Sequence, residues 1–229
     1  MTGRRVALAA VLVALSAAVL PAPGGAANEC RGIPVCISVP GPWVVVPAGV
    51  EAQYLLECPR RRGVVGGIDA LATSRAVRVS FDGRIGSPVG PGTTTSRDAF
   101  FRAVSSAPAV GAFQPFLGCI PAGGRGGRST TSASVTRPGV PVERRAKTVR
   151  LAGKVTRTVS QACARGERLI GSWHALAFRR ATPPPLAVAR QIKLERRVRN
   201  GVVQVRVLTS EGVPQAVRAE VQVGAVCAP

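Results

Sequence analysis

The feature that most constrains this chain is a segment that occurs twice and begins each time with a cysteine. Residues 58–75 recur as residues 163–180 at a constant offset of 105, and seven of these 18 positions are identical. Residues 114–121 then share Gln, Cys and Pro with residues 222–229, at an offset of 108. Self-similarity at a fixed spacing predicts an internal duplication, with two structural units of one kind.

The duplication also suggests how the six cysteines pair. An even number of cysteines in an exported chain is typical of disulfide bonds, although six cysteines allow 15 pairings and sequence alone does not choose among them. Each copy has one cysteine at its start and one at its end. The simplest plan is therefore Cys58 with Cys119, Cys163 with Cys227, and a small N-terminal loop closed by Cys30 and Cys36.

The N-terminus has the order of segments that is typical of a secretory signal peptide. Arg4 and Arg5 precede a 15-residue apolar run, and Pro, Gly and Ala residues follow up to Ala27. We expect residues 1–27 to be a signal peptide that is cleaved after Ala27, with an uncleaved anchor as the alternative. The run is shorter than the roughly 20 residues of a membrane span. We expect no transmembrane span in the mature chain and a secreted or envelope-associated, extracytoplasmic location.

The composition is strongly basic. The whole chain has a net charge of +20, and without Arg4 and Arg5 the mature chain has 29 basic and 11 acidic residues, a net charge of +18. Such a field attracts polyanions, namely nucleic acid, anionic lipid and anionic envelope polymers, and the last are one candidate partner class. The arginines are scattered and few aromatic residues accompany them. Because stacking platforms are lacking, we expect no specific nucleic-acid binding.

The apolar residues predict an all-β fold. Alternating runs occur around residues 77–81, 192–198, 203–207 and 217–223, and Asn200-Gly201 lies between two of them as a hairpin signal. We expect two tandem β-sandwich-like domains, at residues 28–122 and 140–229. The Gly-rich and Ser-rich segment 123–139 is predicted to be a flexible linker. Cleavage there should release two pieces that separate without reduction.

The motif C-P-x-x-x-x-V-V-G-G at residues 58–67 resembles a family of exported bacterial, mainly actinobacterial, proteins with C-P-x-G-x-x-V-x-G-G repeats. The second copy keeps Cys163 and Gly171 but has Ser172 at the second glycine. The resemblance implies secretion and β-structure. It implies no activity and no site residues.

No catalytic motif or cofactor site is evident. His174 is the only histidine, and the sequence contains no phosphate-binding loop and no zinc-protease or nucleophile-elbow motif. At the offset of 105, Asp69 takes the place of His174, which suggests a partly exposed strand position rather than a catalytic one. We expect no cofactor, no metal and no catalytic residues, and we assign the six cysteines to disulfides.

The sequence therefore favours a secreted, non-enzymatic β-domain protein that serves as a binding or structural module at the cell envelope. Two alternatives remain open. One is a low-specificity electrostatic binder of anionic polymers, and the other is a secreted hydrolase whose site no motif marks. A pocket with converging polar groups around His174 would favour the hydrolase. The ligand, the oligomeric state and the packing of the two repeats are not determined by the sequence.

Overall fold

The structure is a computed structural model. It describes residues 27–33, 35–59, 63–82, 97–120, 142–210 and 213–229. Within these ranges the chain consists mostly of antiparallel β-strands, which confirms the predicted all-β class. The predicted linker at 123–139 and the predicted signal peptide, except for Ala27, lie outside the described residues.

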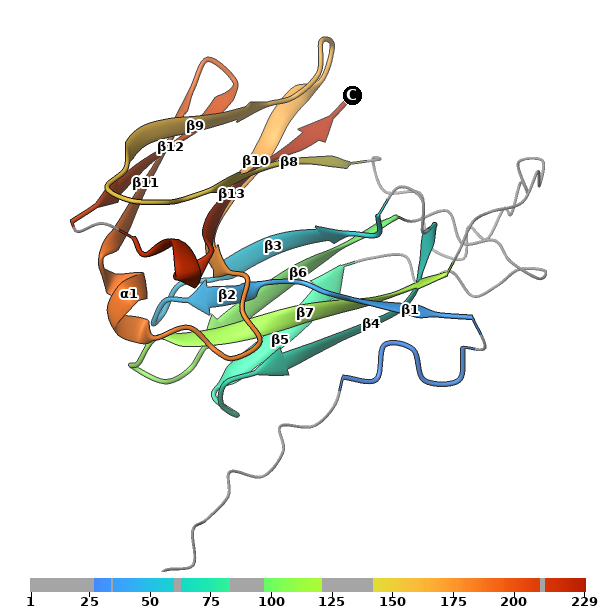
Figure 1. Cartoon of the computed structure of the whole chain (residues 1–229). Helices are drawn as coiled ribbons and strands as arrows, with labels where there is room; N and C mark the ends of the chain where they lie inside the picture. Colours follow the sequence, from blue (N-terminus) through green and yellow to red (C-terminus); the bar gives the residue numbers. More distant parts are fainter. Residues whose placement is uncertain (1–26, 34, 60–62, 83–96, 121–141, 211–212) are drawn as a thin grey trace, which may run out of the picture.

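The first half of the described chain contains seven strands and the second half contains six (Figure 1). Those of the first half are β1 (Ile37–Pro40), β2 (Trp43–Val46), β3 (Ala52–Glu57), β4 (Val64–Ala72), β5 (Val77–Asp82), β6 (Asp98–Ser105) and β7 (Gly111–Ile120). Those of the second half are β8 (Glu143–Arg150), β9 (Thr156–Ala162), β10 (Arg168–Phe178), β11 (Ile192–Arg199), β12 (Val202–Thr209) and β13 (Ala219–Ala228). A short helix, α1 (Leu186–Arg190), precedes β11, and a 3-10 turn, η1 (Gln215–Val217), precedes β13.

The two halves repeat one strand topology. In the first half β7 pairs with β4 and β2, and a separate sheet has the order β3-β6-β5. In the second half β13 pairs with β10 and β8, and a separate sheet has the order β9-β12-β11. One apolar core lies between the two sheets of each half. The predicted hairpin joins β11 to β12 through Asn200 and Gly201, both with the positive φ that such a turn needs.

The strand registers show that the sequence alignment of the repeats is wrong by one residue inside β4 and β10. Asp69 pairs with Phe116, whereas His174 pairs with Val223 and Trp173 pairs with Gly224, the counterpart of Phe116. A shift of one residue turns a side chain to the other face of a sheet. Asp69 and His174 therefore lie on opposite faces, and their predicted equivalence is wrong.

The structure contains the three disulfide bonds that the duplication suggested: Cys30–Cys36, Cys58–Cys119 and Cys163–Cys227. The two long-range bonds have sequence separations of 61 and 64 residues. Cys119 and Cys227 are almost fully buried in the cores of the first and the second half, respectively. Each half thus contains one bond that joins the residue after β3 or β9 to the last strand of that half, β7 or β13.

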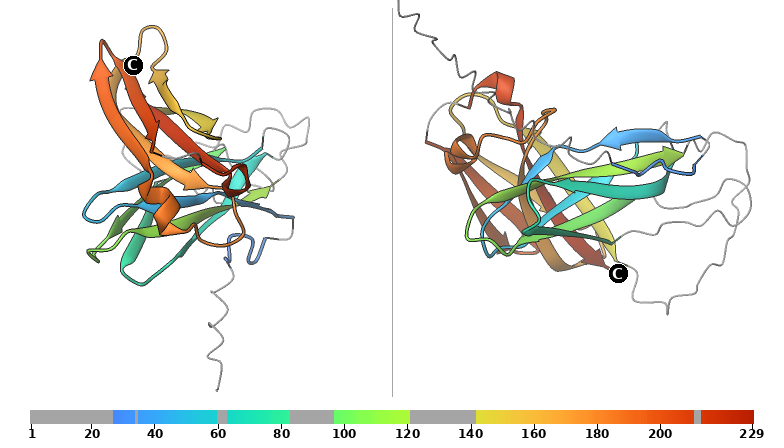
Figure 2. Two further views of the ribbon diagram at one scale, coloured as in Figure 1. Left: turned by 60° about the vertical axis from the view of Figure 1, so that its left-hand side comes forward. Right: turned by 90° about the horizontal axis from the view of Figure 1, so that it is seen from below.

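The halves also share a sheet. Residues Val44 and Trp43 of β2 pair with Ala177 and Phe178 at the end of β10, which makes one seven-stranded sheet from both halves. Figure 2 shows from two further sides that the halves lie against each other. The sequence left this packing open, because the pairing joins strands more than 130 residues apart.

A buried interface adds to this pairing. Trp173 of β10 packs edge-on against Phe100 of β6, with the ring centroids 4.8 Å apart, and Leu55 of β3 completes the cluster. The Tyr54 hydroxyl donates to the Glu220 carboxylate at 3.0 Å. The Gln222 side chain accepts from the backbone N–H of Leu55 at 2.8 Å. The contacts between the halves are therefore both apolar and hydrogen-bonded.

Candidate functional site

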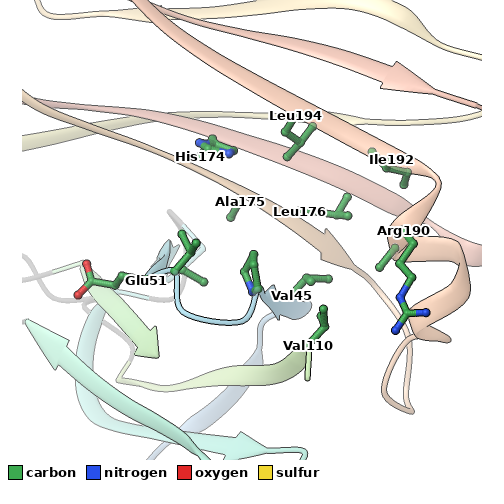
Figure 3. A pocket seen from close by; sticks show the side chains of 13 residues that line it. Val45, Glu51, Val110, His174, Ala175, Leu176, Arg190, Ile192 and Leu194 are labelled. Atoms are coloured by element: carbon green, nitrogen blue, oxygen red, sulfur yellow. The ribbon is translucent and has the colours of Figure 1, made fainter. Parts of the chain in front are cut away.

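The junction of the two halves contains a cavity of about 290 Å³. The first half contributes β2, the turn that leads into β3, and Val110. The second half contributes the middle of β10, the end of α1 and the start of β11. In Figure 3, His174, Leu194 and Ile192 lie on one side of the cavity and Val45 and Val110 on the other.

Two local features shape the walls. On the first half, the turn after β2 begins with Pro47, whose carbonyl accepts from the N–H of Val50, and Gly49 has a φ of +68°, which favours glycine. On the second half, Pro185 caps α1 with a φ of −61° and accepts from the N–H of Ala189. Proline is well suited to the start of a helix because it lacks an N–H. Ala189 thereby faces the cavity.

The lining is mostly apolar. Aliphatic side chains and Pro47 make up ten of the 13 residues, and Glu51, His174 and Arg190 are the others. Glu51 and Arg190 lie at opposite ends of the cavity in Figure 3. Pockets for small molecules commonly combine an apolar lining with a few polar groups that fix the orientation of the ligand.

His174 is the uncharged polar side chain of this lining. Burial and the neighbouring positive charge of Arg196 lower its pKa to about 4. The imidazole is therefore neutral at neutral pH, with one N–H donor and one acceptor nitrogen. Its Nδ1 atom is buried and has no hydrogen-bond partner among the described residues. A buried polar atom without a partner is costly, so this nitrogen is a local polar defect beside the cavity.

The described lining combines His174 with a single carboxylate, that of Glu51. It contains no serine, threonine or cysteine that could act with His174 as a nucleophile. The cavity has one polar centre and two separated charges at its ends.

The six cysteines predicted as disulfide residues lie away from this cavity and serve the fold. Glu167 lies within 4.8 Å of the sulfur atoms of Cys163 and Cys227, a grouping of metal-ligand type. Those sulfurs are joined in a disulfide bond, so they are not thiolate ligands. Sequence reasoning considered His174 but missed the residues around it, because they come from segments that share no motif.

Comparison of the chain with protein-family models, curated proteins and solved structures finds no match. None of the helices in the described part of the chain is long and apolar enough to span a membrane.

Proposed function

We propose that this protein is a secreted, non-enzymatic binding module at the cell envelope, and that the cavity around His174 is its ligand site. The observation that carries the proposal is an apolar cavity lined by a neutral imidazole, whose buried Nδ1 atom has no partner among the described residues. The ligand that suits it is a small, mainly apolar molecule or acyl-like group with one hydrogen-bonding function. A cavity of about 290 Å³ is close to the lower end of the usual range for small-molecule pockets.

Secretion is supported by the predicted signal peptide, by the resemblance to exported repeat proteins and by the three disulfide bonds. Disulfides persist in oxidising compartments outside the cytoplasm. The shared sheet and the buried interface support a stable arrangement of the two walls of the cavity. A binding site between two packed units needs this stability, because a small shift of either wall would change its shape.

A neutral fluorescent apolar compound, N-phenyl-1-naphthylamine, tests the proposal, since a charged probe would also respond to the arginines. We expect saturable binding with one site per chain. Val50 lines the cavity and is largely exposed, so Val50→Trp should block the cavity without disturbing a core. Val198, equally exposed but not in the lining, provides the control Val198→Trp.

Val50→Trp should weaken binding about tenfold or more, while Val198→Trp should leave it unchanged. Equal binding by both variants, or no saturable binding by the natural chain, would rule out the cavity as the ligand site. His174→Phe keeps an apolar ring but removes the polar atom. This substitution should weaken the binding of alcohols and amides that fit the cavity more than the binding of hydrocarbons of the same size.

A further inference from the structure

A second concave region lies at the junction of the halves, and it is basic rather than apolar. Its volume is about 780 Å³ and it is open to solvent. The first half contributes Gly41, Gln114 and Phe116. The second half contributes Arg179, Arg180 and Arg218, and we call the region the arginine hollow. None of its described lining residues is acidic.

The backbone brings these arginines together from two segments. Arg179 and Arg180 directly follow β10, and Arg218 lies between η1 and β13. The N–H of Arg179 donates to the carbonyl of Arg218 at 3.1 Å. Arg218 has a φ of +49°, in the left-handed region that residues other than glycine seldom adopt. Such conformations persist where the surrounding structure enforces them, and they are concentrated at functional sites.

Only one of the three guanidinium groups is neutralised by an acid. Arg179 donates to the Glu220 carboxylate at 2.8 Å, and Glu220, whose side chain is 2% exposed, also accepts from Tyr54. Arg180 and Arg218 form no ion pair with any described residue. The hollow therefore has two uncompensated positive charges beside a third guanidinium that a buried carboxylate holds in place.

The opposite wall is neutral. The Gln114 side chain donates from Nε2 to the carbonyl of Gly41 at 2.9 Å, which fixes the orientation of its amide. Phe116 contributes an apolar surface. Guanidinium groups bind phosphate through paired N–H donors, and a concave surface lowers the exposure of such pairs to water.

We propose that the arginine hollow binds a phosphate group, with Arg180 and Arg218 as its principal ligands and Arg179 as a supporting donor. The phosphate can be free or part of a phosphodiester chain, because the hollow is open to solvent. This site is separate from the cavity around His174 and shares no described lining residue with it. The inference therefore stands on observations of its own.

The test compares two pairs of substitutions that remove the same charge. The first double variant, Arg180→Gln with Arg218→Asn, removes the two arginine charges of the hollow that form no ion pair. Asparagine is chosen at 218 because it tolerates the left-handed backbone conformation. Arg197→Gln with Arg199→Gln removes two exposed arginines of β11 outside the hollow. Arg180→Gln alone keeps the test valid if the first pair impairs folding. Binding of inorganic phosphate and of a glycerol phosphate oligomer is measured by calorimetry at low salt.

The hollow pair should weaken phosphate binding about tenfold or more, and the β11 pair should change it much less. If the hollow pair also loses affinity for the oligomer, the occupant can be a phosphodiester chain. If it loses affinity for inorganic phosphate alone, the occupant is a free phosphate. Equal weakening by both pairs, or no binding by the natural chain, would overturn the proposal. Val50→Trp should not affect phosphate binding, which separates this outcome from that of the apolar cavity.

Discussion

Trp173 and Gly224 face each other across β10 and β13, and the Trp173 ring occupies the space that a side chain at 224 would need. A Cβ atom added at Gly224 would lie 2.0 Å from Cε2 of Trp173. Trp173 is 1% exposed and packs against Phe100 of the other half. The absence of a side chain at 224 therefore allows the contact between the halves.

Gly224→Ala should consequently destabilise the protein. Trp173 would have to shift out of its packed position, and overpacking of this kind costs about 1–3 kcal/mol. Gly171→Ala is a suitable control, since the added Cβ would lie 3.3 Å from the nearest atom, a Val226 methyl carbon, rather than 2.0 Å. In chemical denaturation, the free energy of unfolding should fall clearly for Gly224→Ala and change little for Gly171→Ala. Similar losses for both variants would contradict the packing described here.

How far the sequence predicts this fold can be judged from these same residues. Alternation, turn residues and cysteine positions are local signals, so the all-β class, the hairpin at Asn200-Gly201 and the disulfide pairs were predictable. The one-residue shift between Asp69 and His174 was not, because the strand register makes Val64 and Arg168 counterparts, and Val64 follows Cys58 by six positions whereas Arg168 follows Cys163 by five. In both halves the bulge lies near the start of the strand, at Gly66 in β4 and at Ile170 in β10.

The candidate site was less predictable than the fold. The walls of the cavity meet because β2 pairs with β10, a contact between distant segments that no local pattern encodes. The helix α1 was also missed, since five residues between a proline run and a strand have no helical periodicity. His174 attracted attention only as the sole histidine of the chain.

The two halves should unfold together rather than separately. Tyr54→Phe removes a hydrogen bond to a charged group across the interface and should cost about 1.5–3 kcal/mol. A double-mutant cycle with Glu220→Gln should give a coupling energy of at least about 0.5 kcal/mol, measured from urea unfolding curves. A coupling energy of zero, with two separate unfolding transitions, would show that the halves are independent.

Cleavage within residues 123–139 tests the same contact without substitution. Separate domains would come apart after cleavage, as the sequence alone suggested. The shared sheet and the Trp173–Phe100 contact instead predict that the two fragments elute together in size-exclusion chromatography under non-denaturing, non-reducing conditions. Fragments that elute separately without denaturant would contradict the packing of the halves.

The three disulfide bonds should differ in their effect on stability. Cys58–Cys119 closes a loop with a sequence separation of 61, and Cys30–Cys36 one of 6. The loop-entropy relation predicts that removal of the first bond lowers the free energy of unfolding by about 4 kcal/mol and removal of the second by about 2 kcal/mol. Paired Cys→Ala variants and denaturant unfolding provide the comparison. A larger loss for the Cys30–Cys36 pair would contradict this order.

His174 should make the protein less stable in acid. Its pKa is about 4 in the folded protein and close to 6.5 when unfolded, so the unfolded chain binds more protons between these values. The contribution that neutral His174 makes to the free energy of unfolding is therefore fully present above about pH 6.5 and declines as the pH falls towards 4. Allowing for the partial exposure of the ring, we expect a loss of about 2 kcal/mol. His174→Gln should lack this part of the pH dependence, and identical curves for both proteins would refute the assignment.

The most direct test of the ligand cavity uses the imidazole itself, which is unique in the chain and therefore needs no assignment among several histidines. Its nitrogen resonances can be followed by NMR at neutral pH during a titration with a neutral apolar alcohol that binds competitively with N-phenyl-1-naphthylamine. A saturable shift of the imidazole nitrogen resonances is expected, which fits one ligand per chain and is absent in Val50→Trp. Unchanged imidazole resonances in the presence of bound ligand would show that the ligand site lies elsewhere.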